Sequence, residues 1–256
     1  MPKFAANLNF LFTEVDFMQR FAAARAAGFR GVEFPVPYDH DRDALVAAAR
    51  GAGVEVVLIN SPVGNFAKGE RGLACDPDRV SDFRAGIGEA IGYARALGCK
   101  RINCLAGIVP RGADPRRVRA TLVENLRFAA GALADAGILL VTEPLSTHPG
   151  FALTTTAQAL DLLREVGVAN LKIQYDLFHM QAMEGNLART IEAELPRIGH
   201  MQFADVPDRH EPGTGELNFD FLFGWIDRVG YDGWVSAEYH PARGTAASLG
   251  WLKPYL

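Results

Sequence analysis

Eight short apolar runs alternate with longer helical patterns along the 256 residues of the chain. We expect strands at residues 3–8, 31–34, 54–59, 100–105, 138–143, 171–176, 198–203 and 233–238. We expect helices near residues 14–27, 41–52, 79–97, 115–136, 155–166, 184–195, 219–229 and 244–252. Strands that alternate with helices pair in parallel, because each helix carries the chain back to the starting edge of the sheet. The sequence therefore predicts an α/β protein with a parallel sheet.

The number of strand-helix units favours a closed sheet over an open one. Eight units in a chain of about 250 residues are typical of a (β/α)8 TIM barrel. A doubly wound sheet that binds a dinucleotide would carry Gly-x-Gly-x-x-Gly after its first strand, and residues 7–12 read Asn-Leu-Asn-Phe-Leu-Phe. No linker or low-complexity segment interrupts the alternation. We therefore expect a single TIM-barrel domain over residues 1–256.

Four consecutive apolar runs in the second half of the chain end in a side chain that offers oxygen to a metal. These side chains are Glu143, Asp176, Gln202 and Glu238. In a (β/α)8 barrel the C-terminal ends of all strands meet at one face, where the functional loops lie. A buried carboxylate is costly unless a cation meets it, so several at one place indicate a cation site. Three carboxylates and one amide suit Mg²⁺ or Mn²⁺ better than Zn²⁺ or Cu²⁺.

Each of these residues also has an ordinary structural interpretation. A single acid at the end of a strand usually caps a loop or forms half of a salt bridge, and a single glutamine is usually a buried amide. The hypothesis of one divalent metal ion rests on four consecutive strands that end in the same way. Glu33, Asn60 and Asn103 come at the ends of the second, third and fourth strands, so we expect them at the same face.

Other polar residues are candidates for binding a substrate. His179 lies in an expected loop after the sixth strand, where it would donate to a substrate oxygen or cap the next helix. Arg209 and Arg71, in the segments after the seventh and third strands, would pair with a substrate carboxylate or stay solvated. Asn60 is placed to contact the same ligand. His200 lies one layer below the end of the seventh strand, and we expect a core histidine there.

Composition excludes several classes of function. The formal net charge is −4 and the pI is about 5.9, which does not favour binding to nucleic acid or to an anionic membrane. No stretch approaches the roughly 20 apolar residues that span a membrane, and the first ten residues are too polar for a secretory signal. Three cysteines, Cys75, Cys99 and Cys104, lack metal-site spacing. So sparse a set indicates a reducing compartment, and we expect the cytoplasm.

Several motifs resemble those of one enzyme family. They are Ala5-Ala-Asn-Leu8, Gly28-Phe-Arg-Gly-Val-Glu-Phe34, Gly69-Glu-Arg-Gly72, Thr121-Leu-Val-Glu-Asn-Leu-Arg127, Tyr175-Asp-Leu-Phe-His-Met-Gln181 and Glu211-Pro-Gly-Thr-Gly-Glu216. From about residue 3 to its end, the chain is similar to the hydroxypyruvate isomerase family, which lies within the xylose isomerase-like TIM barrels. The 2-oxo-tetronate isomerases share nearly all of these motifs.

The resemblance implies a cofactor and a mechanism. It implies one divalent metal ion, Mg²⁺ or Mn²⁺, held by Glu143, Asp176, Gln202 and Glu238. It also implies that Glu143 and Glu238 are the catalytic proton donor and acceptor. The expected reaction is aldose-ketose isomerisation of hydroxypyruvate and tartronate semialdehyde through an enediolate, which the metal stabilises as a Lewis acid. The expected partner is thus a small hydroxy-oxo acid.

Four other functions are weighed against this one. A 2-oxo-tetronate isomerase performs the same chemistry on one more carbon. Related ketose 3-epimerases commonly carry histidine where Gln202 stands, which counts against an epimerase. A DNA-repair endonuclease would need several zinc-binding histidines and a basic groove. A catalytically inactive binding protein would have lost a site residue, and all four are present. The sequence does not set the oligomeric state, so a homo-oligomer is left open.

Overall fold

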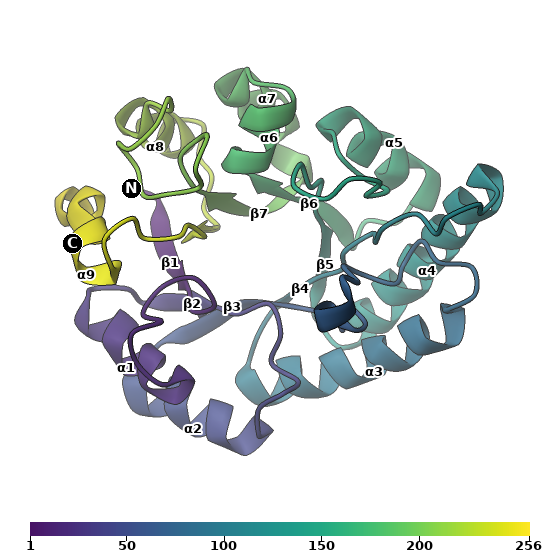
Figure 1. Cartoon of the computed structure of the whole chain (residues 1–256), viewed down its shortest axis with the longest axis horizontal. Coiled ribbons are helices and arrows are strands. Elements are labelled where there is room, and N and C mark those ends of the chain that lie inside the picture. Colours follow the sequence, from purple (N-terminus) through teal and green to yellow (C-terminus); the bar gives the residue numbers. More distant parts are fainter.

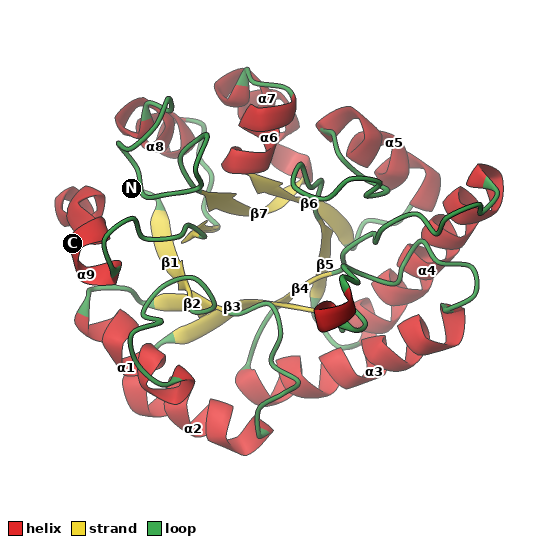
Figure 2. Ribbon diagram, viewed as in Figure 1, coloured by secondary structure: helices red, strands yellow, loops and turns green.

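A closed parallel barrel of eight strands forms the centre of the protein. The computed structural model describes all 256 residues. The strands pair in sequence order from the first to the eighth, and the eighth pairs with the first to close the sheet. Figure 1 shows the strands as a ring enclosed by helices, and Figure 2 shows the loops that join the two layers. The (β/α)8 TIM barrel expected from the sequence is confirmed.

All eight expected strands are present, and their ends differ from expectation by at most two residues. They are β1 (Lys3–Asn7), β2 (Gly31–Glu33), β3 (Glu55–Asn60), β4 (Arg101–Asn103), β5 (Leu139–Thr142), β6 (Leu171–Asp176), β7 (Ile198–Phe203) and β8 (Trp234–Ala237). The α-helices are α1 (Phe17–Ala26), α2 (Arg42–Ala52), α3 (Val80–Leu97), α4 (Pro115–Asp135), α5 (Thr156–Val166), α6 (Leu177–Met183), α7 (Leu187–Glu194), α8 (Phe219–Arg228) and α9 (Thr245–Ser248). Three short 3₁₀ helices are η1 (Phe66–Lys68), η2 (Leu195–Arg197) and η3 (Leu249–Tyr255).

Helix α6 corrects the loop that the sequence predicts after the sixth strand. Asp176 is the last residue of β6, and its side chain accepts a hydrogen bond of 2.9 Å from the backbone N–H of Phe178. A carboxylate in this position caps a helix, so the chain passes from strand to helix without a connecting loop. His179 therefore stands on the first turn of α6. The expected final helix is also different, because α9 is short and continues as η3.

None of the helices combines the length and the apolar character that a membrane span requires.

The interior of the barrel has an apolar part and a polar part. An apolar cluster made only of strand residues fills the part that is distant from the C-terminal ends of the strands. Its members are Ala5, Val57, Leu58 and Val141, and Leu139 and Trp234 pack against them. Toward the C-terminal ends of the strands the buried side chains are polar; they include Asn7, Glu33, Asn103, Gln174, Asp176, His200, Gln202 and Ser236. A larger cluster of 62 buried residues fills the space between strands and helices. The fold thus places its buried polar groups at the face where a TIM barrel carries its site.

Gly31 leaves room for the apolar part of the barrel interior. A Cβ at this position would lie 2.8 Å from the ring of Trp234 and 2.9 Å from a methyl of Val57. Overpacking of this kind costs about 1–3 kcal/mol. We expect Gly31→Ala to lower the Tm by roughly 2–10 °C, since about 1 kcal/mol moves the Tm of a domain this large by 2–4 °C. Thermal unfolding followed by circular dichroism measures the change.

Gly51→Ala is the matched control. Gly51 lies in α2 with no atom within 4 Å of a built Cβ, so alanine there should stabilise by about 0.4–1 kcal/mol. If both substitutions raise the Tm, the interior of the barrel has more room than the structure indicates.

Candidate functional site

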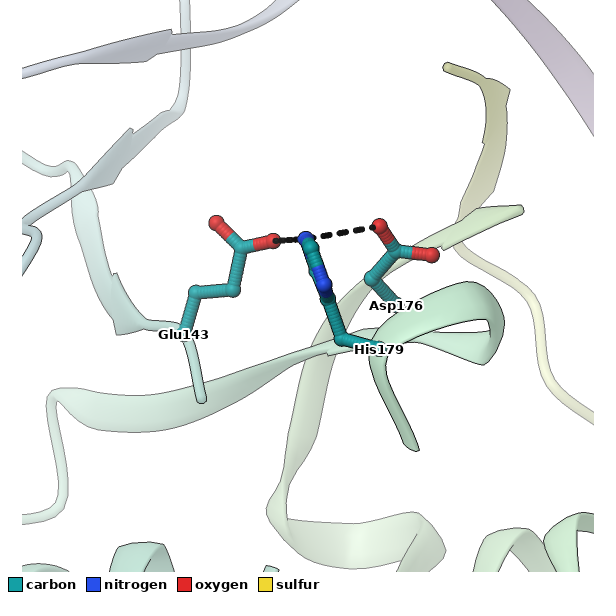
Figure 3. Close-up of side chains that lie close together, drawn as sticks. All are labelled: Glu143, Asp176 and His179. Atoms are coloured by element: carbon teal, nitrogen blue, oxygen red, sulfur yellow. Dashed lines mark ion pairs between the residues drawn. The ribbon is translucent and has the colours of Figure 1, made fainter. Parts of the chain in front are cut away.

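Two of the four expected metal ligands meet at the mouth of the barrel. Glu143 follows β5 and Asp176 ends β6, and both side chains are buried. Ligand atoms of Glu143, Asp176 and His179 all lie within 4.8 Å of one another. Figure 3 shows the three side chains directed toward one point. This cluster is suited to hold a metal ion, because two carboxylates converge there and Asp176 Oδ2 is buried without a hydrogen-bond partner.

His179 is a neutral ring held in place by Ser146. Its Nε2 lies 3.5 Å from Asp176 Oδ2 and 3.9 Å from Glu143 Oε1. Its Nδ1 accepts from the backbone N–H of Ser146 at 3.3 Å, and the Ser146 hydroxyl lies 2.8 Å away. Burial and the positive charge of Arg209 hold the pKa of His179 well below its usual value. An acceptor at Nδ1 leaves the proton on Nε2, so His179 presents an N–H toward the two carboxylates.

Arg209 links Asp176 to Glu238, the third expected acidic ligand. Its guanidinium forms a close ion pair with Glu238 and lies 3.6 Å from Asp176 Oδ2. The rings of Phe10 and Phe178 lie 5.0 and 5.1 Å from its Cζ atom. Two aromatic faces and two carboxylates fix this side chain in one place. The structure therefore brings Glu238 to the cluster through Arg209.

The loop that carries Arg209 is built around one buried carboxylate. Asp205 follows β7 and accepts hydrogen bonds of 2.9–3.1 Å from the backbone N–H groups of Val206, Gly213, Thr214, Gly215 and Leu217. Arg209 itself has a left-handed backbone with φ 58°, a conformation that is uncommon outside glycine. Two glycines of the Glu211–Glu216 motif, Gly213 and Gly215, are thus held by hydrogen bonds from their backbone N–H groups to Asp205.

Gln202, the fourth expected ligand, lies in a hydrogen-bond network below the cluster. The register of β6 and β7 puts it opposite Asp176. Its Nε2 donates to Glu33 Oε1 at 2.6 Å, and its Oε1 accepts from Gln174 Nε2 at 2.6 Å. His200 Nε2 lies 2.7 Å from Glu33 Oε2. Burial alone would raise the pKa of Glu33, but the charge of His200 and these hydrogen bonds hold it below its usual value. His200 is buried, as expected for a core histidine.

Two asparagines orient the two glutamates. Asn103 Nδ2 donates to Glu143 Oε2 at 3.0 Å. Asn7 Nδ2 donates to Glu238 Oε1 at 2.8 Å and also to Glu33 Oε1 at 3.0 Å. The sequence placed Asn103 at this face but gave Asn7 no role. The signal that could have found Asn7 is its position at the end of β1, equivalent to that of Asn103 at the end of β4.

The acidic residues of the cluster repel one another at close range. Burial, with the charges of Glu238 and Asp176, raises the pKa of Glu143 well above its usual value. Burial raises the pKa of Glu238 to about 8, against the opposing effect of Arg209. Burial likewise raises the pKa of Asp176 to about 6. One arginine does not compensate three buried carboxylates, so a divalent cation would relieve a charge that the chain leaves unbalanced.

A cavity of about 660 Å³ opens above these residues. Glu143, Glu238 and the four expected substrate-binding residues line the same cavity: His179, Arg209, Arg71 and Asn60. Asp176 and Gln202 lie deeper and do not line it. The volume lies within the range of about 300–1,000 Å³ that is typical of small-molecule sites. The face predicted from strand ends is thus a single pocket with an acidic floor.

Comparisons with known proteins match the fold over nearly the whole chain. The profile of the xylose isomerase-like TIM barrel family matches residues 21–255. A hydroxypyruvate isomerase from Escherichia coli is 52% identical over 257 residues and is covered in full, as is this chain. A 2-oxo-tetronate isomerase from Cupriavidus necator is 48% identical, with 100% of this chain and 99% of the relative covered. A crystal structure described as a family 2 AP endonuclease from Brucella melitensis superposes with a TM-score of 0.97 at 43% identity, over 100% of this chain and 99% of that one.

The raised pKa values predict how pH and divalent cations act on stability. A carboxyl whose pKa is higher in the folded than in the unfolded protein stabilises the fold at low pH and loses that contribution as the pH rises through the folded value. With chelator present, we expect the Tm to fall between pH 5 and pH 8, because the folded protein keeps the Glu238 proton up to about pH 8 whereas the unfolded chain releases it near the usual pKa. At pH 8, Mn²⁺ at about 100 times its Kd should raise the Tm by roughly 5–10 °C.

Differential scanning calorimetry of two variants tests the origin of this effect. Glu238→Gln should flatten the dependence of Tm on pH and weaken the response to Mn²⁺. Glu124→Gln, at an exposed position on α4, should keep both. A Tm that rises from pH 5 to pH 8 in chelator would contradict the assignment.

Proposed function

This chain belongs to the xylose isomerase-like TIM barrel family, and we propose that it is a hydroxypyruvate isomerase. The chain is an isomerase, as are its full-length relatives. The substrate assignment rests on 52% identity over the whole chain to a hydroxypyruvate isomerase. The observation that carries the chemistry is the pair Glu143 and Glu238, two carboxyls with raised pKa values that line one pocket. Two such groups can serve as the acceptor and the donor in proton transfer between neighbouring carbons.

We also propose one divalent metal ion, Mg²⁺ or Mn²⁺, as the cofactor. Glu143, Asp176 and Glu238 would hold it with Gln202, whose Oε1 keeps a second lone pair beside the one that Gln174 uses. An all-oxygen set of this kind suits a hard cation. A bound divalent ion would supply Lewis acidity that stabilises the negative charge developing on the substrate oxygens. His179 would contribute a hydrogen bond from Nε2 to one of these oxygens.

The two glutamates would move the proton. Hydroxypyruvate becomes tartronate semialdehyde when a proton leaves the carbon next to the carbonyl and a proton is added to the carbonyl carbon, with an enediolate between the two steps. The hydroxyl on the first carbon also loses its proton and becomes the new carbonyl, and the former carbonyl oxygen gains a proton and becomes the new hydroxyl. One carboxylate takes the first proton, and the carboxyl on the other side of the substrate donates the second. Asn103 and Asn7 hold Glu143 and Glu238 in fixed orientations for this exchange. Burial raises the pKa of both carboxyls above the usual value, to about 8 for Glu238, and a raised pKa favours the transfer of a proton to and from a carboxylate.

The second candidate is a 2-oxo-tetronate isomerase. A relative with that activity is 48% identical over the full chain, and a cavity of about 660 Å³ has room for the additional carbon. An epimerase has less support, because Gln202 stands where histidine is common in the related ketose 3-epimerases. An endonuclease would need several metal-binding histidines. The cluster contains only His179, and the mouth is acidic.

A side-by-side assay tests the substrate assignment. The purified protein with Mg²⁺ or Mn²⁺ should interconvert hydroxypyruvate and tartronate semialdehyde, with a higher kcat/KM than for 2-oxo-tetronates. A preference for 2-oxo-tetronates would transfer the assignment to the second candidate. Turnover of neither acid would overturn both.

Substitution of either glutamate tests the proton-transfer mechanism. We expect Glu143→Gln and Glu238→Gln to lower kcat by at least about 10²-fold, the contribution typical of general acid-base groups. Glu124→Gln is the matched control and should keep wild-type kcat. Isomerisation in D₂O should place deuterium on carbon in the product, as observed by proton NMR. Product free of deuterium would instead indicate a hydride shift and exclude the two-glutamate mechanism.

A further inference from the structure

We propose that Arg71 binds the carboxylate of the substrate and thereby sets the direction in which the acid enters the pocket. This inference rests on the proposed function for the identity of the acid. It concerns the division of labour between Arg71 and Arg209, the two arginines that line the cavity. Both are candidates by charge alone, and their surroundings separate them.

Arg209 already has anionic partners. It forms its close pair with Glu238 and lies 3.6 Å from Asp176. Arg71 has no carboxylate within ion-pair distance, although it is only partly exposed. An arginine withdrawn from water without an acidic partner is ready to receive an anion from outside the chain. The cavity thus contains one neutralised arginine and one free arginine.

The guanidinium of Arg71 is held in a fixed plane. Its Nη1 donates to the backbone carbonyls of Phe66 at 3.1 Å and Glu70 at 2.8 Å. Its Cζ lies 3.7 Å from the centre of the Phe66 ring, which is a stacking distance. Nε and Nη2 make no hydrogen bond within the protein. One edge of the guanidinium therefore remains for a carboxylate, whose two oxygens match two parallel N–H donors.

The segment that carries Arg71 is anchored at both ends. Glu70 accepts from the backbone N–H of Asn65 at 2.5 Å and from Arg79 Nη1 at 3.0 Å. Gly72 has φ 111°, and a Cβ there would clash with the backbone carbonyl of Leu105. Only glycine tolerates this backbone conformation and this close approach. Arg71 is therefore presented by a constrained turn.

The charges of the pocket set the orientation of the acid. The floor carries Glu143 and Glu238, with Asp176 beneath it, and these carboxylates repel the carboxylate of a ligand. Arg71 and His148 also line the pocket, and burial, followed by the charges of Arg71 and Arg209, lowers the pKa of His148. A hydroxy-oxo acid bound with its carboxylate at Arg71 directs its reacting carbons to the glutamates. The same orientation applies to acids of three and four carbons, because the unreactive end is the one that is held.

Binding measurements test the assignment independently of turnover. Isothermal titration calorimetry with D-glycerate, an acid that lacks the reacting carbonyl, is compared with glycerol, its neutral counterpart, in the presence of Mn²⁺. We expect Arg71→Met to raise the Kd for glycerate by about 10- to 100-fold, as the loss of a charge-assisted bidentate contact should. The weak binding of glycerol should not change. Arg71→Lys, which keeps the charge without the planar edge, should give an intermediate Kd.

Arg84→Met is the matched control. Arg84 is an exposed arginine stacked over Phe128, with Cζ 4.9 Å from the ring centre, on helices outside the pocket. This variant should bind glycerate as the wild type does. A wild-type Kd for glycerate in Arg71→Met, or an equal loss of glycerate and glycerol binding, would overturn the proposal.

Kinetics separate this proposal from the function on which it rests. Dihydroxyacetone carries CH₂OH in place of the carboxylate, so Arg71→Met should lower kcat/KM for hydroxypyruvate far more than for dihydroxyacetone. If Arg71→Met raises the Kd for glycerate while the wild type does not isomerise hydroxypyruvate, the carboxylate site is supported and the proposed function is wrong. If the wild type isomerises hydroxypyruvate while Arg71→Met keeps the wild-type Kd for glycerate, only the assignment of Arg71 to the substrate carboxylate is wrong.

Discussion

The structure depends on one electrostatic constraint, the burial of Glu33, Glu143, Asp176 and Glu238 at the C-terminal end of the barrel. Glu33 is compensated by His200, whose Nε2 lies 2.7 Å away. Glu143, Asp176 and Glu238 share one arginine, Arg209, and the pKa of each is raised by burial. Leaving charge unbalanced in a low-dielectric interior costs stability. It also leaves a cluster of carboxylates that is suited to hold a divalent cation, which an apolar barrel interior could not be.

Amide side chains connect the compensated carboxylate to the uncompensated ones. Asn7 donates to both Glu33 and Glu238, and Gln202 donates to Glu33 from the adjacent strand end. Removing one member would leave a buried donor or acceptor without a partner, which costs more than the hydrogen bond itself contributes. Glu33 therefore helps to orient the side chains around the pocket, although it does not line the pocket itself. Its effect on the pocket passes through the orientations of Glu238 and Gln202.

The sequence predicted the parts of the structure that follow from local pattern. Apolar runs and helical periodicity identify strands and helices because each run must bury one face. The rule that strand ends converge in a barrel located Glu143 and Asp176. Helix α6 was missed because Asp176 ends a strand and caps a helix at once, so no turn residues separate the two elements. Contacts between strands that are far apart in the sequence were not predictable. The hydrogen bond from Asn7 to Glu238, for example, forms only because β8 pairs with β1 and closes the barrel.

The two arginines show that the role of a site residue can depend on the three-dimensional structure even when the residue itself is identified from the sequence. In the sequence, Arg71 and Arg209 are equivalent, since each lies in a segment that follows a strand and contains glycines. Asp205 gathers the backbone of its loop and sets Arg209 against Glu238 and Asp176. The turn at Gly72 holds Arg71 over Phe66, away from any acid. Backbone conformation thus decides which arginine balances the protein's own carboxylates and which arginine remains for an anionic ligand. The chemistry of the two side chains is the same and does not make this distinction.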